Sequence, residues 1–290
     1  MKIAFISGSV TTPLGFGQQT KILADYFISK GHEIYVLCEN RLDMEVAGIQ
    51  EFALGPFDLK KYDKELYRIQ PDVVICFDWY MKLFQMPYLT YSGKCKFFMW
   101  FPYESSLVQQ AHKNYFVNMP KNRLVFISQM TKNIWGKYAN SSMVIPHAID
   151  VDIWTKPLTV EDRVAIYDRM RLNSSHEYVI NLNRNDPRKR WDLFFDAAEH
   201  LYRRNNNYRF IVHSNKENGY YNFEEMEDWY GLKGKVIYTD YNLISGLSRE
   251  ELATLVKCCS LRVDPSVGEG FGLTVAEVAD RKSTRLNSSH

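Results

Sequence analysis

Short apolar runs alternate along this chain with longer segments in which apolar residues recur every three or four positions. Buried strands that alternate with helices are typical of parallel sheets covered on both faces. The expected strands are 3–7, 33–37, 71–77, 96–100, 124–128, 178–182, 208–213, 236–238 and 261–263. The expected helices are a segment that follows a loop at 8–18 and runs to Lys30, and then 133–138, 160–171, 189–203 and 248–257.

The strand and helix pattern stops in the middle of the chain and then starts again. Residues 146–157 carry a proline at each end and are typical of a connection between domains. A chain of 290 residues is long enough for two ordinary domains. We therefore expect an α/β protein with two Rossmann-like domains, the first at 1–149 and the second at 150–279.

The most informative segment is 269–277, which follows the expected strand at 261–263. Glycines at 268, 270 and 272 allow the backbone to approach a ligand closely. The first amides of the helix that follows carry a partial positive charge that suits a phosphate group. Glu269 precedes this helix, and Glu277 lies about 12 Å further along its axis. A long ligand with a diphosphate at its centre, such as a sugar nucleotide, can therefore meet both carboxylates.

The spacing of these two glutamates resembles the Glu-x7-Glu motif of the retaining GT-B glycosyltransferases called group 1, or family 4-like. The segment 144–150 is similar to the family's interdomain segment, so the similarity covers nearly all of 1–279. The resemblance implies that Glu269 contacts the donor sugar and that Glu277 binds the ribose hydroxyls. It also implies that the donor diphosphate binds the amides of Gly270, Phe271, Gly272 and Leu273.

The same resemblance implies a fold and a reaction. The fold would be GT-B, with the acceptor side in 1–149 and the nucleotide-sugar site in 150–279. The enzyme would be a hexosyltransferase-type glycosyltransferase, as in polysaccharide biosynthesis. It would move a sugar from a nucleoside diphosphate sugar to an acceptor with retention of anomeric configuration, by same-face attack and without a protein nucleophile. No cofactor or metal is implied, because the sugar nucleotide is itself a substrate.

Arg184 and Lys189 lie in the loop after the first strand of the second domain. Open α/β sheets bind ligands at this end of their strands. The nucleoside diphosphate leaves with extra negative charge, which fixed cations stabilise more in the transition state than in the ground state. The resemblance assigns Arg184 and Lys189 to the donor diphosphate. A solvated helix start is the alternative for this basic run.

Gly15 and Gly17 follow the first strand and resemble the family's glycine-rich loop, beside the donor phosphates and the acceptor. They lack the third glycine of a dinucleotide fingerprint. Residues 100–104, which include three aromatics, end a strand and either line an acceptor site or pack in the core. Nothing in the sequence indicates whether the acceptor is a glycan, a lipid or a protein.

Composition narrows the partners and the compartment. With 46% hydrophobic residues the chain can bury packed cores, and a net charge of +2 gives no reason to expect nucleic acid as a partner. The five cysteines show no Cys-x-x-Cys spacing, which favours reduced thiols in the cytoplasm over disulfides or a zinc site. No run resembles a signal peptide or a transmembrane helix. We expect a cytoplasmic protein and leave open a peripheral contact at the inner membrane face.

Asp150 and Asp152 match a metal-binding Asp-x-Asp triplet of another glycosyltransferase fold. Their place in the domain connection argues against a metal there, and so does the resemblance to a family that needs none. His147 lies in the same connection, where we expect a structural hydrogen-bonding residue rather than a base.

Residues 280–290 turn polar and basic where the preceding helix should continue. The string matches the in-frame translation of a common sequencing-library adapter. We therefore expect the natural sequence to stop near Ala279 and 280–290 to be a non-native, adapter-derived tail, which would leave the second domain incomplete and the fragment itself inactive. A genuine disordered tail is the alternative.

Other functions fit a fold of this kind. A sugar-nucleotide epimerase would bind the same nucleotide, but it needs acid–base residues that the sequence does not single out. A non-catalytic nucleotide-binding or glycan-binding protein would bind without turnover. An NAD-dependent dehydrogenase fits less well, because the phosphate signal lies in the second domain and the first loop lacks the full glycine fingerprint.

Overall fold

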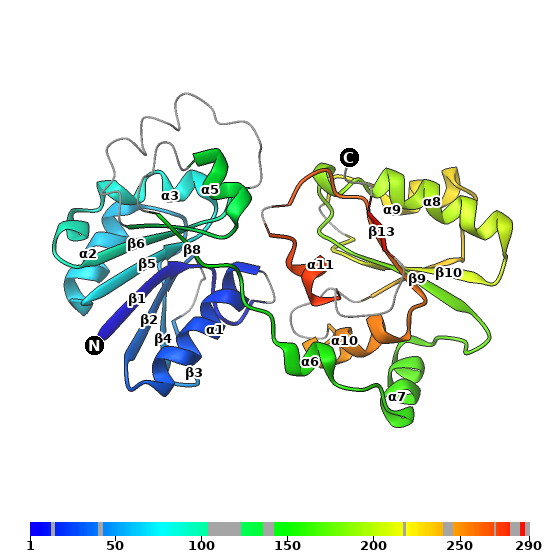
Figure 1. Cartoon of the computed structure of the whole chain (residues 1–290), viewed down its shortest axis with the longest axis horizontal. Coiled ribbons are helices and arrows are strands. Elements are labelled where there is room, and N and C mark those ends of the chain that lie inside the picture. Colours follow the sequence, from blue (N-terminus) through cyan, green and yellow to red (C-terminus); the bar gives the residue numbers. More distant parts are fainter. Residues whose placement is uncertain are drawn as a thin grey trace. The chain divides into compact units, whose positions relative to one another are not determined.

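A computed structural model describes residues 1–12, 15–39, 43–103, 123–135, 142–216, 219–239, 246–269, 271–278 and 285–287. The chain divides into two compact units, Met1–Ala148 and Ile149–His290, and each is built on one sheet (Figure 1). Among the described residues, no helix is both long enough and apolar enough to cross a membrane.

The first unit contains an eight-stranded sheet in the order β3-β4-β2-β1-β5-β6-β7-β8. Neighbouring strands are parallel, except that β3 and β4 form an antiparallel pair at one edge. The strand predictions in this half are confirmed to within a few residues, whereas β3, β4 and β8 were not predicted. The strands are β1 (Lys2–Ser7), β2 (Glu33–Cys38), β3 (Met44–Val46), β4 (Ile49–Ala53), β5 (Val73–Phe77), β6 (Lys96–Phe101), β7 (Leu124–Phe126) and β8 (Met143–Val144).

Helices cover both faces of this sheet, because successive strand residues point to opposite sides. In β1, Ala4 and Ile6 belong to one apolar cluster, and Ile3 and Phe5 belong to another. The helix α1 (Gly15–Ser29) packs on the second cluster. The first cluster is covered by α2 (Leu59–Ile69), α3 (Tyr80–Leu83), η1 (Met86–Tyr88), η2 (Thr90–Gly93) and α5 (Gln129–Trp135).

The second unit contains five parallel strands in the order β11-β10-β9-β12-β13. These are β9 (Glu177–Leu182), β10 (Tyr208–His213), β11 (Val236–Tyr238), β12 (Leu261–Asp264) and β13 (Arg285–Asn287). The β9–β12 strands and the helices α7 and α10 confirm the predicted elements of this half. The helices are α6 (Val151–Thr155), α7 (Val160–Met170), η4 (Pro187–Lys189), α8 (Trp191–Arg204), α9 (Phe223–Trp229), α10 (Arg249–Cys258) and α11 (Leu273–Glu277).

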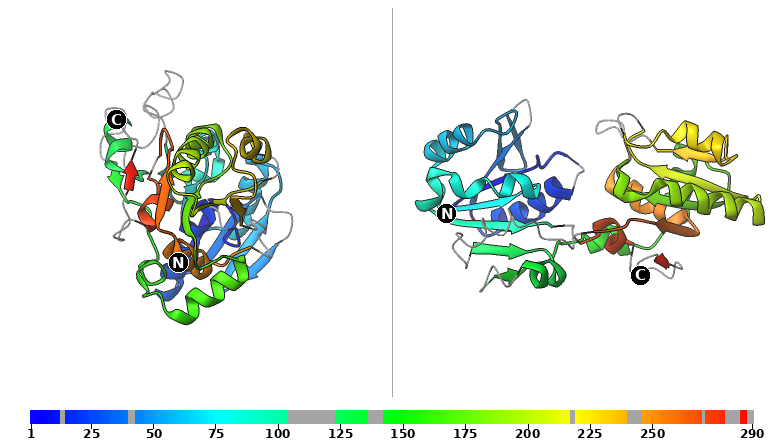
Figure 2. Two further views of the ribbon diagram at one scale, coloured as in Figure 1. Left: turned by 90° about the vertical axis from the view of Figure 1, so that its right-hand side faces the viewer. Right: turned by 90° about the horizontal axis from the view of Figure 1, so that it is seen from above.

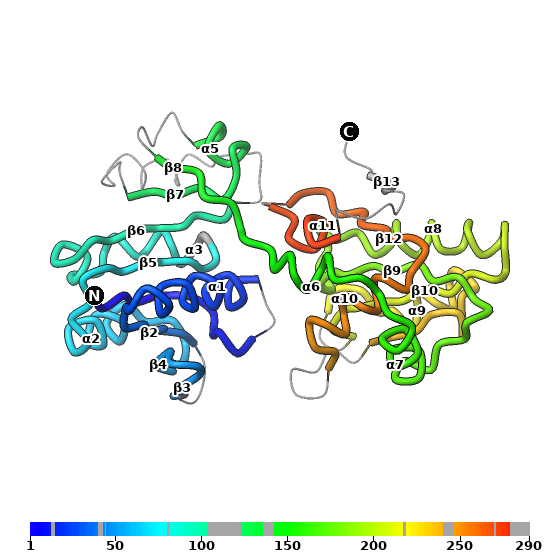
Figure 3. The backbone as a smooth tube through the Cα atoms, turned by 60° about the horizontal axis from the view of Figure 1, so that its bottom comes forward, coloured from blue at the N-terminus to red at the C-terminus, as the bar shows by residue number. Residues whose placement is uncertain are grey.

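Two apolar clusters lie on opposite faces of this second sheet. On one face, Trp191, Phe194 and Phe195 of α8 pack with α9 against β9 and β10. On the other face, α6, α7 and α10 pack against the alternate residues of β9, among them Tyr178 and Ile180. Figures 2 and 3 show helices on both sides of each sheet from other directions.

The strand β13 lies within 280–290, the segment that the sequence predicts to be foreign to the natural protein. Its residues pair in parallel with 262–264 of β12. The other residues of that segment lie outside the described ranges, so the origin of the tail stays a prediction.

The first helix begins earlier than the sequence pattern predicted. We expected a loop at 8–18, but α1 begins at Gly15, so both Gly15 and Gly17 lie in its first turn. A side chain at position 17 would place a Cβ 2.0 Å from the carbonyl oxygen of Ser9. The loop prediction was wrong because Gly17 allows the helix backbone to pack closely against the backbone of Ser9. A glycine needed for such packing looks the same in the sequence as a glycine in a loop.

We predict that Gly17→Ala lowers the free energy of unfolding by about 1–3 kcal/mol, because the helix must move away from Ser9 to admit the methyl group. Gly93→Ala is the matched control, since a Cβ at position 93 meets no atom within 4 Å. Urea unfolding followed by tryptophan fluorescence measures both variants. Equal stabilities of the two would contradict the packing role of Gly17.

Candidate functional site

The strand order of the second unit has a switch point between β9 and β12. From β9 the chain adds β10 and β11 on one side, and then returns to place β12 on the other side. In open parallel sheets, ligands bind outside the carboxyl ends of the two strands at such a point. The loops 183–190 and 265–272 follow β9 and β12 at this edge of the sheet. We therefore expect a ligand site at these two loops.

A short 3-10 turn gives the loop after β9 a fixed shape. The carboxylate of Asp186 accepts the backbone N–H of Arg188 at 3.0 Å, which caps η4 at its start. Arg190 then adopts φ 48, a left-handed conformation that costs energy for a residue with a Cβ. Its guanidinium compensates by binding both carboxylate oxygens of Asp192, at 2.9 and 3.1 Å from Nε.

Two further anchors hold the same loop to its surroundings. The buried Trp191 donates its indole N–H to the carbonyl oxygen of Arg184 at 2.9 Å. Asn185 exchanges two hydrogen bonds of 2.8 Å with the backbone of Tyr221. The loop is therefore held at its start, middle and end, so the side chains it presents are preorganised.

Lys189 and Glu269 meet across the two loops. Lys189 is only 6% exposed, and its ammonium pairs with Oε1 of Glu269. A lysine ammonium is costly to bury unless it is paired. Arg188 joins the same carboxylate, with Nη1 3.2 Å from Oε1. The structure thus brings two of the three predicted catalytic residues into contact.

Arg184, the third predicted catalytic residue, does not join this group. Its side chain is exposed, and it makes no ion pair with the residues that the structure describes. Its backbone is nevertheless fixed through Trp191. The loop therefore combines a fixed backbone with a cation that remains accessible to a ligand.

A buried polar network links the ends of β9 and β12. Asn183 donates to Oδ1 of Asp264 at 3.1 Å, and the Ser266 hydroxyl donates to the same oxygen at 2.6 Å. Arg262 lies 3.0 Å from the other carboxylate oxygen. Burial raises the pKa of Asp264, but the hydrogen bond from Ser266 and the charges of Arg262 and Lys189 outweigh it, so the pKa is lowered. The carboxylate therefore adds negative charge beneath the cationic loop.

The helix α11 follows the loop after β12. Gly272 caps it with φ 74, a conformation that favours glycine, and the helix runs from Leu273 to Glu277. The first amides of this helix have no acceptor within it. The diphosphate contacts expected at Phe271, Gly272 and Leu273 stay a prediction. Gly270, the remaining predicted contact, lies outside the described residues.

Glu277 at the end of α11 is largely buried and paired. Nη2 of Arg249, from α10, lies 2.9 Å from its Oε1. Burial raises the pKa of Glu277, although the charges of Arg249 and Arg262 act in the opposite direction. Arg262 also donates to the carbonyl oxygen of Thr274, which ties α11 to β12.

The sequence did not single out Arg188, Arg249 or Arg262. Arg188 belongs to the same basic segment as Lys189, but the sequence spacing alone does not indicate which residue it contacts. Arg249 is 28 residues from Glu277, and no local pattern joins two positions so far apart. Arg262 is a charged residue in a short strand that begins Leu-Arg-Val, and that interruption of the apolar run was the signal available.

The aromatic candidates in the first unit belong to its core. Trp100, Phe101 and Tyr103 are 4%, 0% and 3% exposed, and the Trp100 indole donates to the carbonyl oxygen of Ile145 at 2.8 Å. The core interpretation is therefore the correct one for these three residues, while residue 104 lies outside the described part.

The pKa of His147 is lowered to about 4 by burial, so its imidazole is neutral near pH 7. Its ring packs edge-on against the rings of Phe77 and Trp100. Asp150 caps α6 by accepting the N–H of Ile153 at 3.3 Å. Asp150 therefore acts as a helix cap, and the structural role of His147 is ring packing. The hydrogen-bonding role that we expected for His147 stays a prediction.

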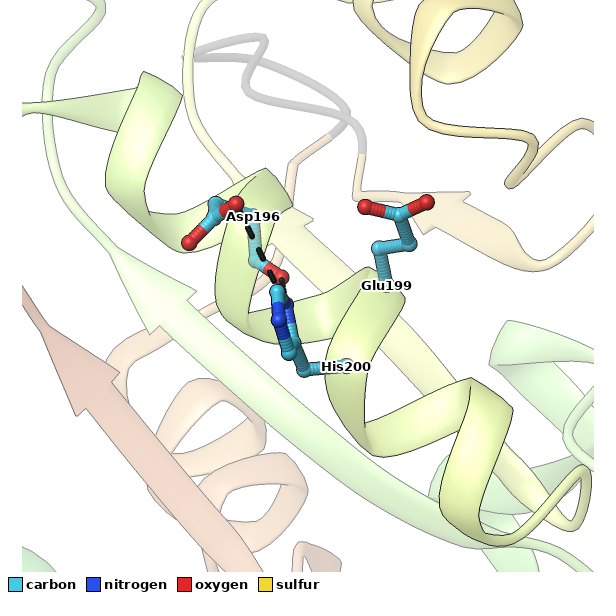
Figure 4. Close-up of side chains that lie close together, drawn as sticks. All are labelled: Asp196, Glu199 and His200. Atoms are coloured by element: carbon cyan, nitrogen blue, oxygen red, sulfur yellow. Dashed lines mark hydrogen bonds and ion pairs between the residues drawn. The ribbon is translucent and has the colours of Figure 1, made fainter.

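Two other features of the second unit are separate from these loops. Asp196, Glu199 and His200 gather on α8 (Figure 4), but Glu199 is paired with Arg203 at 2.6 Å and the His200 Nδ1 lies 2.9 Å from the Asp196 carbonyl oxygen. A hollow of about 330 Å³ lies between α6, α7 and α10, and none of the predicted site residues lines it.

No protein-family model and no curated protein matches the sequence. Solved structures do match. HepE of Anabaena, crystallised with UDP and glucose, aligns over 96% of this chain and 78% of its own at 14% identity, with a TM-score of 0.72. A glycosyltransferase from Rickettsia africae aligns over 96% and 76% at 15% identity, with a TM-score of 0.71. WaaG, a glycosyltransferase of lipopolysaccharide biosynthesis, aligns over 96% and 78% at 12% identity, with a TM-score of 0.68.

The chain has the GT-B fold. The alignments extend across both units, and these solved structures are two-domain GT-B glycosyltransferases. The expected fold class, α/β with two Rossmann-like domains, is thereby confirmed. At identities of 12–15%, the likeness concerns the fold.

We predict that Lys189→Met costs about 1–3 kcal/mol of stability, because it leaves the Glu269 carboxylate without its buried partner. Adding Glu269→Gln should recover part of that loss, which a double-mutant cycle in urea measures. Lys21→Met is the matched control and should cost less than about 1 kcal/mol, because its pair with Asp25 is exposed. Additive losses in the cycle would contradict the coupling.

His213 ends β10 beside β9, with Nδ1 2.7 Å from the Thr239 hydroxyl, and burial lowers its pKa to about 4. The His213 imidazole is protonated below about pH 6.5 in the unfolded chain, but only below about pH 4 in the folded chain. The stabilisation is therefore present above pH 6.5 and is lost as the pH falls. We predict that the wild type loses on the order of 2 kcal/mol more stability than His213→Asn between pH 7 and 5, measured by urea titrations at each pH, because His147 contributes its own loss to both proteins. Parallel pH profiles would refute it.

Proposed function

We propose that this protein is a retaining glycosyltransferase that takes its sugar from a nucleoside diphosphate sugar. The observation that carries the proposal is the meeting of the loops after β9 and β12, where Arg188 and Lys189 face Glu269. Fixed cations beside a carboxylate, at the switch point of a parallel sheet, suit a ligand that joins an anionic diphosphate to a sugar. Solved structures of the same fold, which include HepE with UDP-glucose, support a nucleotide sugar as donor.

In this proposal the diphosphate binds the cationic loop and the start of α11. Arg184 has an exposed side chain on an anchored backbone, so it can grip a phosphate without a large ordering cost. Lys189 adds a point charge, and the amides of Phe271, Gly272 and Leu273 add neutral donors. As the bond to the sugar breaks, negative charge grows on the leaving diphosphate, and these groups stabilise it.

The two glutamates hold the ends of the donor. Glu269 binds a hydroxyl of the sugar, and Glu277 binds the ribose hydroxyls. Each carboxylate has one oxygen, Oε1, paired with an arginine or lysine, and Oε2 makes no hydrogen bond with the described residues. Because a carboxylate accepts through both oxygens, Oε2 remains available to a hydroxyl donor.

Retention follows if the acceptor attacks the face that the diphosphate leaves. The leaving diphosphate can then accept the proton of the acceptor hydroxyl, so the protein supplies no nucleophile. Neither a cofactor nor a metal enters this reaction, because the cations and amides of the second unit carry the charge stabilisation. The transferred group is a hexose in this proposal.

We assign the acceptor side to the first unit on the family resemblance alone. Of the two glycines proposed for that side, Gly15 is exposed and Gly17 is buried against the backbone of Ser9. Gly15 is therefore the better placed to meet a ligand. The reaction would take place in the cytoplasm or at the inner membrane face.

We predict that UDP or GDP binds the protein, and that Arg184→Ala and Glu277→Ala each weaken this binding by about 1–3 kcal/mol, the scale of a lost charged hydrogen bond. Calorimetric titration measures both nucleotides and shows which base is preferred. Arg203→Ala is the matched control, because it removes a cation from the exposed end of α8. Equal losses in all three variants would point to general electrostatics rather than to a site.

Turnover separates the remaining functions. A new glycoside whose anomeric proton shows the donor's configuration by NMR supports the retaining transferase. An isomerised free sugar with no modified acceptor would indicate an epimerase instead. Tight nucleotide binding without any turnover would indicate a non-catalytic binding protein.

A further inference from the structure

Arg188 connects the two loops of the candidate site more extensively than any of the residues that the sequence singled out. Its carbonyl oxygen accepts the N–H of Val267 at 3.1 Å. Its guanidinium Nη1 donates to the carbonyl oxygen of Gly268 and lies 3.2 Å from Oε1 of Glu269. One residue of the loop after β9 thus contacts three consecutive residues of the loop after β12.

The position of Arg188 is itself fixed. Its N–H donates to the Asp186 carboxylate at 3.0 Å, and its side chain is only 20% exposed. The backbone bond to Val267 and the side-chain bond to Gly268 hold two adjacent residues of the same short segment. This bracing leaves the segment before Glu269 little freedom to move.

The contacts also choose between the two oxygens of the Glu269 carboxylate. Both Arg188 and Lys189 reach Oε1, while Oε2 makes no hydrogen bond with the described residues. A carboxylate held through one oxygen presents the other in a defined direction. That orientation is what a sugar hydroxyl needs in order to donate a well-aligned hydrogen bond.

We propose that Arg188 is a positioning residue for the donor sugar: it braces 267–269 and holds Oε1 of Glu269, so that Oε2 faces a sugar hydroxyl. This inference rests on the proposed function and deepens it. Arg188 acts here through Glu269, in contrast to Arg184, which acts on the diphosphate. Its loss should therefore weaken the binding of a sugar nucleotide but not that of the nucleoside diphosphate alone.

The test compares two ligands in one set of variants. The sugar nucleotide is the tightest binder among UDP-glucose, UDP-galactose, UDP-N-acetylglucosamine and GDP-mannose, and the reference ligand is UDP or GDP to match. We expect Arg188→Ala to weaken the sugar nucleotide about tenfold and the diphosphate less than about twofold, by calorimetric titration. Unchanged diphosphate binding also shows that the variant is folded.

Two further variants make the test specific to Glu269. In a Glu269→Ala background, Arg188→Ala should have no additional effect on the sugar nucleotide, because the oxygen that it orients is gone. Arg188→Lys keeps the charge but lacks the planar fork of the guanidinium, so it should rescue less than half of the lost affinity. Arg203→Ala, on the exposed end of α8, should behave as the wild type for both ligands.

The outcomes separate the two proposals. An equal loss for both ligands in Arg188→Ala, or full rescue by lysine, would overturn the positioning role and make Arg188 a diphosphate contact. No loss for either ligand would overturn it as well. If the wild-type protein binds none of these nucleotides, the proposed function itself fails, and the inference fails with it.

Discussion

The arrangement of the loops after β9 and β12 depends on the buried ammonium of Lys189. Taking a lysine charge out of water costs several kcal/mol unless a partner compensates. That partner, Glu269, lies 80 residues further along the chain. The pair can form only because β12 returns to lie beside β9, and because parallel strands deliver both loops to one edge. The apolar packing of α8 and α10 on opposite faces of the sheet makes that return stable.

Much of the remaining polar structure restrains the loops around this pair. The positive φ of Arg190 is offset by its bidentate contact with Asp192, and Trp191 pins the loop start through a backbone carbonyl. Beneath the loop, Asp264 collects a serine, an asparagine and an arginine. When the dipoles and charges of a site are already oriented, little reorganisation energy is needed as charge develops on a ligand. Preorganisation of this kind is the main way in which proteins stabilise developing charge.

Glu269 and Glu277 are held in the same manner although they come from different places. An arginine from another element takes one carboxylate oxygen in each case: Arg188 from the loop after β9, and Arg249 from α10. This arrangement keeps each acidic side chain in one orientation and leaves a second acceptor oxygen. Two oriented acceptors in the same unit as a cationic loop suit the proposed donor, a ligand with hydroxyls at both ends and a diphosphate between them.

The sequence by itself determined the α/β class and most strand positions, because strand burial and helix periodicity are local properties. It also showed that the candidate site residues of the second domain follow β9 and β12. Through the family resemblance it also predicted that Lys189 and Glu269 lie close together, and the structure confirms their contact. The sequence wrongly predicted Gly17 to lie in a loop, because its close contact with the Ser9 backbone cannot be recognised from neighbouring residues. Only the tertiary structure selected Arg188 and Arg249 as the partners of the two glutamates. The physical reason is that an ion pair depends on a distance in space, and strand order sets this distance for residues far apart in the chain.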